Sequence, residues 1–340
     1  MLIGETIALF VAMSWTVTAL FAEVGSKRMG SLSFNAVRMA LSLVFLALTL
    51  WLTMGTPFPR YADGRTWLWL LLSGLVGYVV GDYCLMQGYI IIGSRFGQLF
   101  MTLSAPTAAI LGRLFIGEQM RSLAIVGMVV TLSGIALSVL SKRDAIDPPQ
   151  GSRDDSRTSA SHGSLRLSIS RRGVFFAAMA GICQGAGLVL SKIGLEYYDA
   201  ALLAQGLSDA TVPDGALVPL PLRVSIPFAS TMMRGAMGLV GFLALLLFFS
   251  PNGVERLRHA VGDRKALWCA FGSMIFGPFV GVSLSLMATQ YTSTGIAQTL
   301  FALTPVLIIA PAAWLFHQKV TFREVLGAVI SVVGASLFFI

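Results

Sequence analysis

Four ionisable residues of this chain lie within long apolar stretches, where a charge is costly: Arg38, Asp82, Lys192 and Arg234. A charged side chain at the centre of a membrane helix costs about 3 kcal/mol on insertion scales, so it is expected to face a bundle interior or a cavity. Asp82 is the one carboxylate well inside such a stretch, and burial would suit it to proton exchange. We expect Asp82 to serve coupling or substrate binding, or to form a structural pair with Arg38 or another cation.

The other charged candidates lie closer to the ends of their apolar stretches. Arg38 and Arg234 are candidates for substrate binding, although a long side chain near a helix start can also snorkel to the interface, and anchoring is the favoured interpretation. Glu23 and Lys192 are expected at gates or helix ends.

Uncharged polar and aromatic residues at mid-depth add hydrogen-bonding capacity suited to a polar or amphipathic solute. The candidates for a solute site are Trp15, Tyr78, Tyr83, Gln98, Gln184 and Gln298.

Catalytic, metal and cofactor sites are not indicated. The three histidines, at 162, 259 and 317, are scattered, and the three cysteines lie apart with no CxxC spacing. No phosphate-binding GxxxxGK[ST] loop occurs, so direct ATP drive is not expected. The net charge of +8 does not indicate nucleic acid, because the basic residues lie mostly at the ends of apolar stretches and between them, without interleaved aromatics. We expect neither an enzyme nor a bound cofactor or metal.

The elements that must position these residues are membrane-spanning helices. The chain has 340 residues, 56% of them hydrophobic and 12% charged, with a mean hydropathy of +0.79, which predicts an all-α integral membrane protein. Apolar stretches of suitable length predict ten spans, at 3–22, 33–52, 66–90, 95–116, 121–140, 173–193, 228–249, 265–288, 294–316 and 321–340.

The two halves of the chain repeat each other. Moving the segment 77–137 forward by 200 positions places Gly77, Gln98 and Gly127 on Gly277, Gln298 and Gly327. Offsets of 169 and 196 relate the earlier parts, so that Glu23 corresponds to Lys192 and Arg38 to Arg234. Five spans in each copy give the copies opposite orientations, and inverted repeats are typical of secondary transporters.

The repeat predicts the domain organisation. Residues 1–141 form the first repeat and 173–340 the second, with an insertion at 195–227 that is expected to lie along the membrane surface. Residues 142–172 are rich in Ser, Arg and Asp and predict a disordered polar linker.

Local motifs resemble the EamA module of the drug/metabolite transporter superfamily. In the first half they are Met13-Ser-Trp15, Arg38 within Asn35-Ala-Val-Arg-Met-Ala, Gly77-Tyr78, Ser104-Ala-Pro106 and Gly117-Glu118. The second half resembles the same module through Lys192, Arg234, Thr304-Pro305, Gly327 and Gly334. The resemblance implies a ten-helix transporter with a central pathway between the halves.

Together these features favour a secondary active transporter that moves a small metabolite or amphipathic solute across the cell membrane, with protons or another ion as possible coupling partners. The alternatives are a membrane sensor or scaffold without transport, and less plausibly a membrane-embedded enzyme. Lysine and arginine concentrate in the linker and in loops on its side, which would place the linker in the cytoplasm and both termini outside, whereas relatives of this kind are usually drawn with both termini inside.

Overall fold

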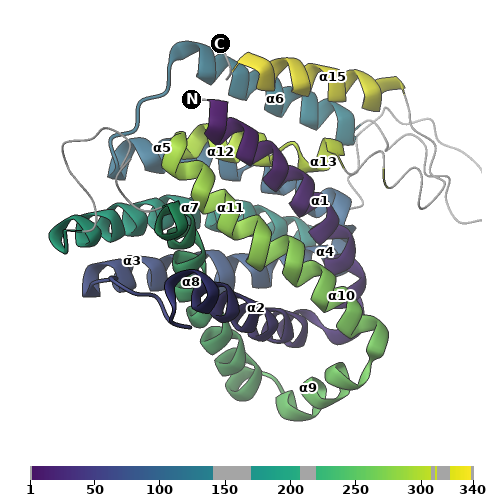
Figure 1. Ribbon diagram of the computed structural model, residues 1–340. Coiled ribbons are helices and arrows are strands. Elements are labelled where there is room, and N and C mark those ends of the chain that lie inside the picture. Colours follow the sequence, from purple (N-terminus) through teal and green to yellow (C-terminus); the bar gives the residue numbers. More distant parts are fainter. Residues whose placement is uncertain (1, 141–169, 207–219, 308–310, 312–321, 338–340) are drawn as a thin grey trace, which may run out of the picture.

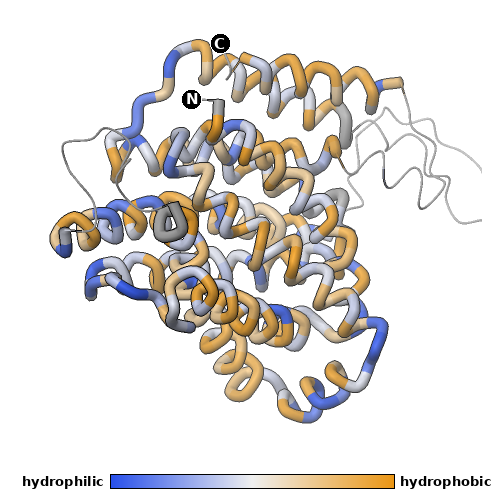
Figure 2. The backbone as a smooth tube through the Cα atoms, in the orientation of Figure 1, coloured by the Kyte–Doolittle hydropathy of each residue, from blue (hydrophilic) through white to orange (hydrophobic). Residues whose placement is uncertain are grey.

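The computed structural model describes residues 2–140, 170–206, 220–307, 311 and 322–337. Over these ranges the regular elements are all helices (Figure 1). Figure 2 shows that hydrophobic residues make up most of the helices, while hydrophilic residues gather at helix ends and connections. This is the distribution expected of helices whose outer surfaces face lipid.

The first half contains seven helical elements, one of which is a π-helix, labelled η1. They are α1 (Leu2–Met29), α2 (Ser31–Met54), α3 (Gly64–Gly74), η1 (Leu75–Asp82), α4 (Tyr83–Met101), α5 (Ser104–Phe115) and α6 (Ser122–Leu140).

In its described residues the second half follows the same order with two more elements, because a short helix is inserted and the counterpart of α4 is divided into two helices. Its elements are α7 (Arg171–Ala204), α8 (Leu220–Phe249), α9 (Gly253–Gly262), α10 (Arg264–Met274), the π-helix η3 (Ile275–Phe279), α11 (Val280–Tyr291), α12 (Thr294–Phe301), α13 (Thr304–Leu307) and α15 (Phe322–Ser336).

Six helical stretches in the described residues are long and apolar enough to cross a bilayer. They are Ile3–Met29, Ser31–Met54, Gly64–Ser94, Arg171–Ala204, Val224–Phe249 and Arg264–Tyr291. Three shorter apolar helical stretches occupy Ser122–Leu137, Thr294–Leu307 and Val325–Ser336. The chain is therefore a multi-pass, all-α membrane protein.

The structural details of the third predicted span recur in the eighth at the same offset of 200. Asp63 caps the N-terminus of α3 through the backbone N–H of Thr66, and Asp263 caps α10 through the N–H groups of Lys265 and Ala266. Both spans then pass through a π-helix, and both π-helices contain the glycine that the repeat aligns, Gly77 or Gly277.

The fourth and ninth predicted spans are interrupted at equivalent points. α4 ends at Met101 before α5 begins at Ser104, and α12 ends at Phe301 before α13 begins at Thr304. Each break is followed at once by a proline, Pro106 or Pro305, which cannot donate a backbone hydrogen bond. The helices are therefore interrupted next to Pro106 and Pro305, whereas most of the surroundings of Pro311 lie outside the described residues.

The helices that open each half are exchanged between the halves. α1 packs against α10, α11 and α12 of the second half, and α7 packs against α3, η1, α4 and α5 of the first. We call α3, η1, α4, α5 and α7 bundle A, and α1, α10, η3, α11, α12 and α13 bundle B. The two sequence halves are therefore not two separate five-helix bundles.

Glycines permit the close approach of α7 to the interrupted fourth span. A Cβ atom at Gly181 would lie 3.3 Å from that of Leu103, and one at Gly185 would lie 2.9 Å from that of Thr107. The Gly181-xxx-Gly185 face therefore serves close packing of the two helices. In bundle B the hydroxyl of Thr304, at the equivalent break, donates to the carbonyl of Ala12 on α1 at 3.3 Å.

Two pairs of equivalent helices flank the bundles. α2 packs against α8, and α6 packs against α15. In the second pair the equivalent residues Thr131 and Ser331 exchange hydrogen bonds, each hydroxyl donating to the other's carbonyl at 3.4 and 3.3 Å. Reciprocal bonds of this kind are what a pseudo-two-fold axis between the repeats requires.

The predicted insertion differs in part from the expectation. α7 continues without a break to Ala204, because no glycine or proline follows Gly194 before Gly206, and Tyr198 is fully buried with its hydroxyl bonded to the carbonyl of Arg60. α8 in turn begins at Leu220, before the expected start at 228, and includes Pro227. Both ends of the insertion thus extend helices, while residues 207–219 lie outside the described residues, as does nearly all of the predicted linker.

Candidate functional site

A buried ion pair joins α2 to the π-helix η1 of bundle A. Arg38 on α2 donates through Nη2 to Oδ2 of Asp82, the last residue of η1. The exposed fractions of the two side chains are 3% and 9%. The expected snorkelling of Arg38 to the interface is wrong, because its guanidinium is turned inward and Asp82 neutralises its charge.

Two amides complete the network around the ion pair. The side-chain amide of Gln184 on α7 donates to Oδ1 of Asp82 at 2.8 Å and to the carbonyl of Gly77 at 3.3 Å. Arg38 also donates to Oδ1 of Asn35 at 2.9 Å. Both carboxylate oxygens of Asp82 therefore have donors, so this buried charge is compensated.

A local distortion of the helix presents Asp82 to this network. π-helical turns inside α-helices commonly mark functional sites because they redirect side chains. η1 ends at Asp82, and its glycines let neighbouring chains approach: a Cβ at Gly77 would lie 3.1 Å from Nη2 of Arg234. The equivalent Gly277 lies near Nη1 of Arg38, at 3.7 Å on the same measure.

A cavity of about 50 Å³, sized for water molecules, adjoins the ion pair. Six of the predicted site residues line it, contributed by α1, α2, η1, α4 and α7: Trp15, Arg38, Tyr78, Asp82, Gln98 and Gln184. Thr18, Leu85, Met86, Tyr89, Met101, Gly277, Pro278 and Val282 complete the lining. Sites for small molecules usually measure about 300–1,000 Å³, so in this conformation the cavity is closed around very little space.

Three predicted residues lie beside the cavity without lining it. The carbonyl of the Gln298 side chain accepts from Ser104 at 3.1 Å, and its amide donates to the backbone of Gln184, so it joins the two interrupted spans. Tyr83 packs edge-on against Phe176. Arg234 is 3% exposed and lies over the ring of Tyr78, so the expectation of interfacial anchoring is wrong for this arginine too.

Sequence reasoning did not single out Asn35 and Tyr89 as site residues. Asn35 bonds Arg38 and donates to the carbonyl of Asp82, and the Tyr89 hydroxyl accepts from Gln98. Asn35 sits one helical turn before Arg38, a spacing at which side chains of a helix meet, so this partner could have been inferred. Tyr89 carried no comparable signal.

Glu23 closes one end of the interface between the bundles. Its Oε2 accepts from the backbone N–H of Ser94 at 3.0 Å and from the Ser94 hydroxyl, and Oε1 accepts from Lys27 at 2.6 Å. Gly93, with φ 81°, makes the left-handed turn that starts the fourth predicted span. The bonds from Ser94 join α1 of bundle B to a helix start in bundle A, and we call them the Glu23 seal.

Lys192 and Glu118 close the opposite end. Glu118 accepts from Lys192 at 2.6 Å, from the backbone N–H of Thr294 at 3.0 Å and from the Thr294 hydroxyl at 2.6 Å. Lys192 also donates to the carbonyl of Thr292 at 3.3 Å. These contacts join bundle A to the start of α12 in bundle B, and we call them the Lys192 seal.

The local backbone positions Glu118. α5 ends at Phe115, and Gly117 then adopts φ 74°, which turns the chain back so that the N–H of Glu118 reaches the carbonyl of Gly112 at 3.2 Å. A Cβ at Gly112 would lie 2.6 Å from both Oε2 of Glu118 and the Thr294 hydroxyl. The seal therefore needs glycine at 112.

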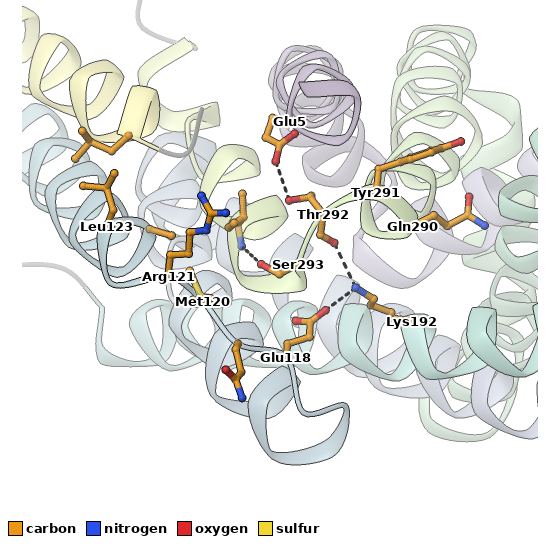
Figure 3. Close-up of a pocket in the computed structure, with 14 residues that line it drawn as sticks. Glu5, Glu118, Met120, Arg121, Leu123, Lys192, Gln290, Tyr291, Thr292 and Ser293 are labelled. Atoms are coloured by element: carbon orange, nitrogen blue, oxygen red, sulfur yellow. Dashed lines mark hydrogen bonds and ion pairs between the residues drawn. The ribbon is translucent and has the colours of Figure 1, made fainter. Parts of the chain in front are cut away.

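A cavity of about 430 Å³ lies outside the Lys192 seal (Figure 3). Glu5, Glu118, Arg121 and Lys192 line it together with residues 290–293. Figure 3 shows Glu5 above the seal, where it accepts from the Thr292 hydroxyl at 3.1 Å. Both seals lie eight residues from a cavity-lining position, Trp15 to Glu23 and Gln184 to Lys192, which is about 12 Å along a helix.

Comparison with known families matches two segments of the chain. The pattern of the EamA-like transporter family matches residues 2–140 and 220–340, which is well over half of the sequence. The chain belongs to the EamA-like transporter family. This EamA protein is thus a membrane transporter of the drug/metabolite transporter superfamily, and the match falls on both halves of the chain.

Comparison with whole proteins identifies a similar fold but no substrate. No curated protein matches the sequence. One solved structure, described only as a crystal structure of a protein, is similar with a TM-score of 0.64 and 13% identity, covering 98% of this EamA chain and 95% of its own. Among the described residues, no three His, Cys, Asp or Glu side chains are grouped as a metal site would need.

Proposed function

We propose that this EamA protein is a secondary active transporter with ten spans that carries a small metabolite or amphipathic solute across the cell membrane by alternating access. The observation that carries the proposal is a closed cavity with an ionised network, flanked at both ends by seals between the same two bundles. A pathway that can be closed at either end, around one central site, is what alternating access requires.

Rocking of bundle A against bundle B would open one seal while the other stays closed. The seals suit this role because each consists of a carboxylate on one bundle and a helix N-terminus on the other. Free N–H groups at a helix N-terminus favour a carboxylate, yet water can replace that carboxylate once the end opens. Widening at one end would also enlarge the 50 Å³ cavity to the size of a solute.

Asp82 is proposed as the coupling residue. It lines the cavity, and its pairing with Arg38 and Gln184 can change when it gains a proton. The repeat places Val282 at the equivalent position, so the carboxylate belongs to only one copy. Packing symmetry alone does not require such a charge.

Uptake into liposomes tests this function. Purified protein is reconstituted, a defined mixture of metabolites is added outside under a pH gradient, and retained solutes are quantified by mass spectrometry. We expect at least one solute to accumulate above empty liposomes, and Asp82→Asn to abolish accumulation while the variant remains folded and inserted. Failure of every solute to accumulate would favour the alternative of a sensor or scaffold, and pH-independent accumulation in both proteins would remove Asp82 from coupling.

A further inference from the structure

The positive charge of Arg234 is not neutralised by any described residue. Its side chain is 3% exposed, its Nε has no hydrogen-bond partner, and no ion pair to it occurs in the described ranges. Its guanidinium carbon lies 5.1 Å from the centroid of the Tyr78 ring. A cation over an aromatic ring recovers only part of the cost of removing that charge from water.

The repeat identifies what Arg234 lacks. Arg38 is its equivalent and pairs with Asp82, whereas the repeat places Val282 at the position of Asp82 in the second half. The helices share the same register there: Asn35 bonds the carbonyl of Asp82 in the first half, and its equivalent Thr231 accepts from the hydroxyl of Ser283, next to Val282, at 3.1 Å. The second copy thus keeps the arginine without the carboxylate.

Three buried groups without hydrogen-bond partners line the cavity beside Arg234. They are the hydroxyls of Thr18 and Tyr78 and Nε of Arg38. With Nε of Arg234 they make four unsatisfied groups, each of which can donate a hydrogen bond, and the two arginine nitrogens can only donate. The two arginines and Asp82 together carry one net positive charge. Buried donors normally have partners, so four in one place indicate a ligand that accepts hydrogen bonds.

We propose that the transported solute carries an anionic carboxylate group that binds between Arg38 and Arg234, with the hydroxyl of Tyr78 as a third donor. Guanidinium groups bind carboxylates through paired, charge-assisted hydrogen bonds. The inference rests on the proposed transport function and names the class of its substrate.

The remainder of the cavity indicates the body of this solute. Trp15, Leu85, Met86 and Met101 supply apolar and sulfur-containing surface opposite the charged groups. Methionine side chains adapt to varied shapes. A small organic acid with an apolar body matches this lining. Tyr78 separates Arg234 from the cavity, so its side chain turns aside as the carboxylate binds.

Asp82 would then compete with the solute for Arg38. While Asp82 is ionised it occupies Arg38, and a proton taken up from water removes its charge and releases the guanidinium. The carboxylate of the solute replaces that of Asp82, so one proton accompanies one anion. This assigns Asp82 the coupling role without requiring a cationic substrate.

Thermal unfolding of the purified full chain tests the charge preference. The probes are small aliphatic and aromatic monocarboxylates, each with its neutral amide and its amine of the same body, and inorganic phosphate. A bound probe stabilises the folded protein by mass action, and we expect at least one carboxylate to raise Tm by about 2 °C or more, with no rise from its amide or amine. A rise with phosphate alone would indicate a phosphate-bearing solute and overturn the carboxylate.

Variants of Arg234 test whether this residue binds the carboxylate of the probe. Arg234→Gln should weaken binding of the active carboxylate at least about tenfold, because a charge-assisted contact is lost. Arg234→Lys keeps the charge and should retain part of the affinity. Arg258→Gln, on the exposed surface of α9, is the matched control and should bind as wild type. Equal affinity in wild type and Arg234→Gln would overturn the proposal.

A variant that adds the missing carboxylate tests the proposal by a gain of stability, so a variant that fails to fold cannot be mistaken for support. Val282→Asp places in the second copy what Asp82 provides in the first, so it should pair with Arg234, raise Tm without any probe and abolish the shift caused by the carboxylate. In Arg234→Gln/Val282→Asp the gain in Tm should disappear. A Val282→Asp protein that still binds the carboxylate would contradict the assignment.

The binding experiments and the transport experiment can be contradicted independently of each other. If amines or amides bind and carboxylates do not, or if no carboxylate shifts Tm, the substrate class is wrong, while accumulation in liposomes can still support transport. If carboxylates bind as described but nothing accumulates, the site is right and the transport function is wrong.

Discussion

The two ends of the interface between the bundles are closed by different residues. At the Glu23 end, a single carboxylate on α1 reaches the start of the fourth predicted span. At the other end, the residue equivalent to Glu23 is Lys192, which cannot cap a helix N-terminus, and Glu118 caps the ninth span in its place. The two repeats therefore share the geometry of the seal but not the residue that forms it.

The difference predicts which end opens more readily. Glu118 is 11% exposed and holds Lys192, which itself bonds the carbonyl of Thr292 in bundle B. Glu23 is 27% exposed, and its lysine partner Lys27 is on its own helix. Ionic contacts weaken as water reaches them. We infer that the Glu23 end is the weaker closure, so the protein opens there first.

The largest effect is expected from breaking the Lys192 seal. Glu118→Gln removes the carboxylate and leaves a partly buried lysine without its counter-ion, which should cost roughly 3 kcal/mol of stability. The melting temperature in detergent measures the loss. Lys192→Met/Glu118→Gln removes both charges and should recover part of it, whereas an unchanged melting temperature in Glu118→Gln would show that the ion pair does not hold this end.

Converting one seal into the other sharpens the comparison. Lys192→Glu/Glu118→Gln gives the Lys192 end the chemistry of the Glu23 end, with a carboxylate on α7 facing the start of α12. We expect this double variant to be more stable than Lys192→Glu alone, because the single change puts two carboxylates together. Equal instability of both would mean that position 192 cannot reach Thr294.

A smaller effect is expected from Glu23→Gln. The amide can still accept from Ser94, but the bonds are no longer charge-assisted, so the loss should be about 1–2 kcal/mol. Opening of this end is measured with a Thr18→Cys substitution in the cavity. We expect Glu23→Gln to increase the labelling of this cysteine by a membrane-impermeant maleimide added at the Glu23 end. Lys27→Gln is the control, since Lys27 contacts Glu23 without joining the bundles, and labelling that rises equally in both variants would contradict the seal.

The smallest effect concerns the capping aspartates at the two ends. The bond from Arg28 and then the backbone N–H of Ala266 hold the pKa of Asp263 below its ordinary value. A carboxyl with a lowered pKa stabilises the fold above its unfolded-state pKa, near 4, and this contribution is lost as the pH falls through the lower folded-state value.

Asp63 is the matched control for that pH dependence. Its pKa is lowered chiefly by bonds from Thr66, with no arginine bonded to it from another helix. The acid-induced loss of melting temperature should shrink slightly in Asp263→Asn, and by less in Arg28→Gln, which leaves the backbone bond from Ala266 in place. A change in Asp263→Asn that Arg28→Gln does not share would assign the effect to helix capping alone.

Much of this architecture was predictable because the chain contains two copies. The offset of 200 that aligned Gly77 with Gly277 also aligned the caps, the π-helices and the breaks at the prolines. The exchange of α1 and α7 between bundles was not predictable, since apolar periodicity identifies a buried face and not the partner that covers it. The extension of α7 to Ala204 was missed for a related reason: the apolar length set the predicted end of the helix, although no helix-breaking residue occurs there.

The site was predictable in composition more than in geometry. A charge inside an apolar stretch pointed to Asp82 and Arg38, and the structure pairs them. The inward orientation of Arg234 was missed, because a position near a helix start favours snorkelling unless a glycine on the facing helix, here Gly77, makes room. Glu118 was recognised only as part of a motif, since its role depends on the turn at Gly117 and on Thr294 from the other repeat.

Alternating access around the central cavity is tested most directly by distances measured at both ends of one protein. Spin labels at Ile91 and Val261 report on the Glu23 end, and labels at Ile3 and Leu203 on the Lys192 end, in a background without Cys84, Cys183 and Cys269. Pulsed electron paramagnetic resonance in liposomes then compares wild type with Glu23→Gln. We predict that the variant widens the 91–261 distance while the 3–203 distance stays short or narrows. Widening at both ends together, or no change at either, would contradict alternating access.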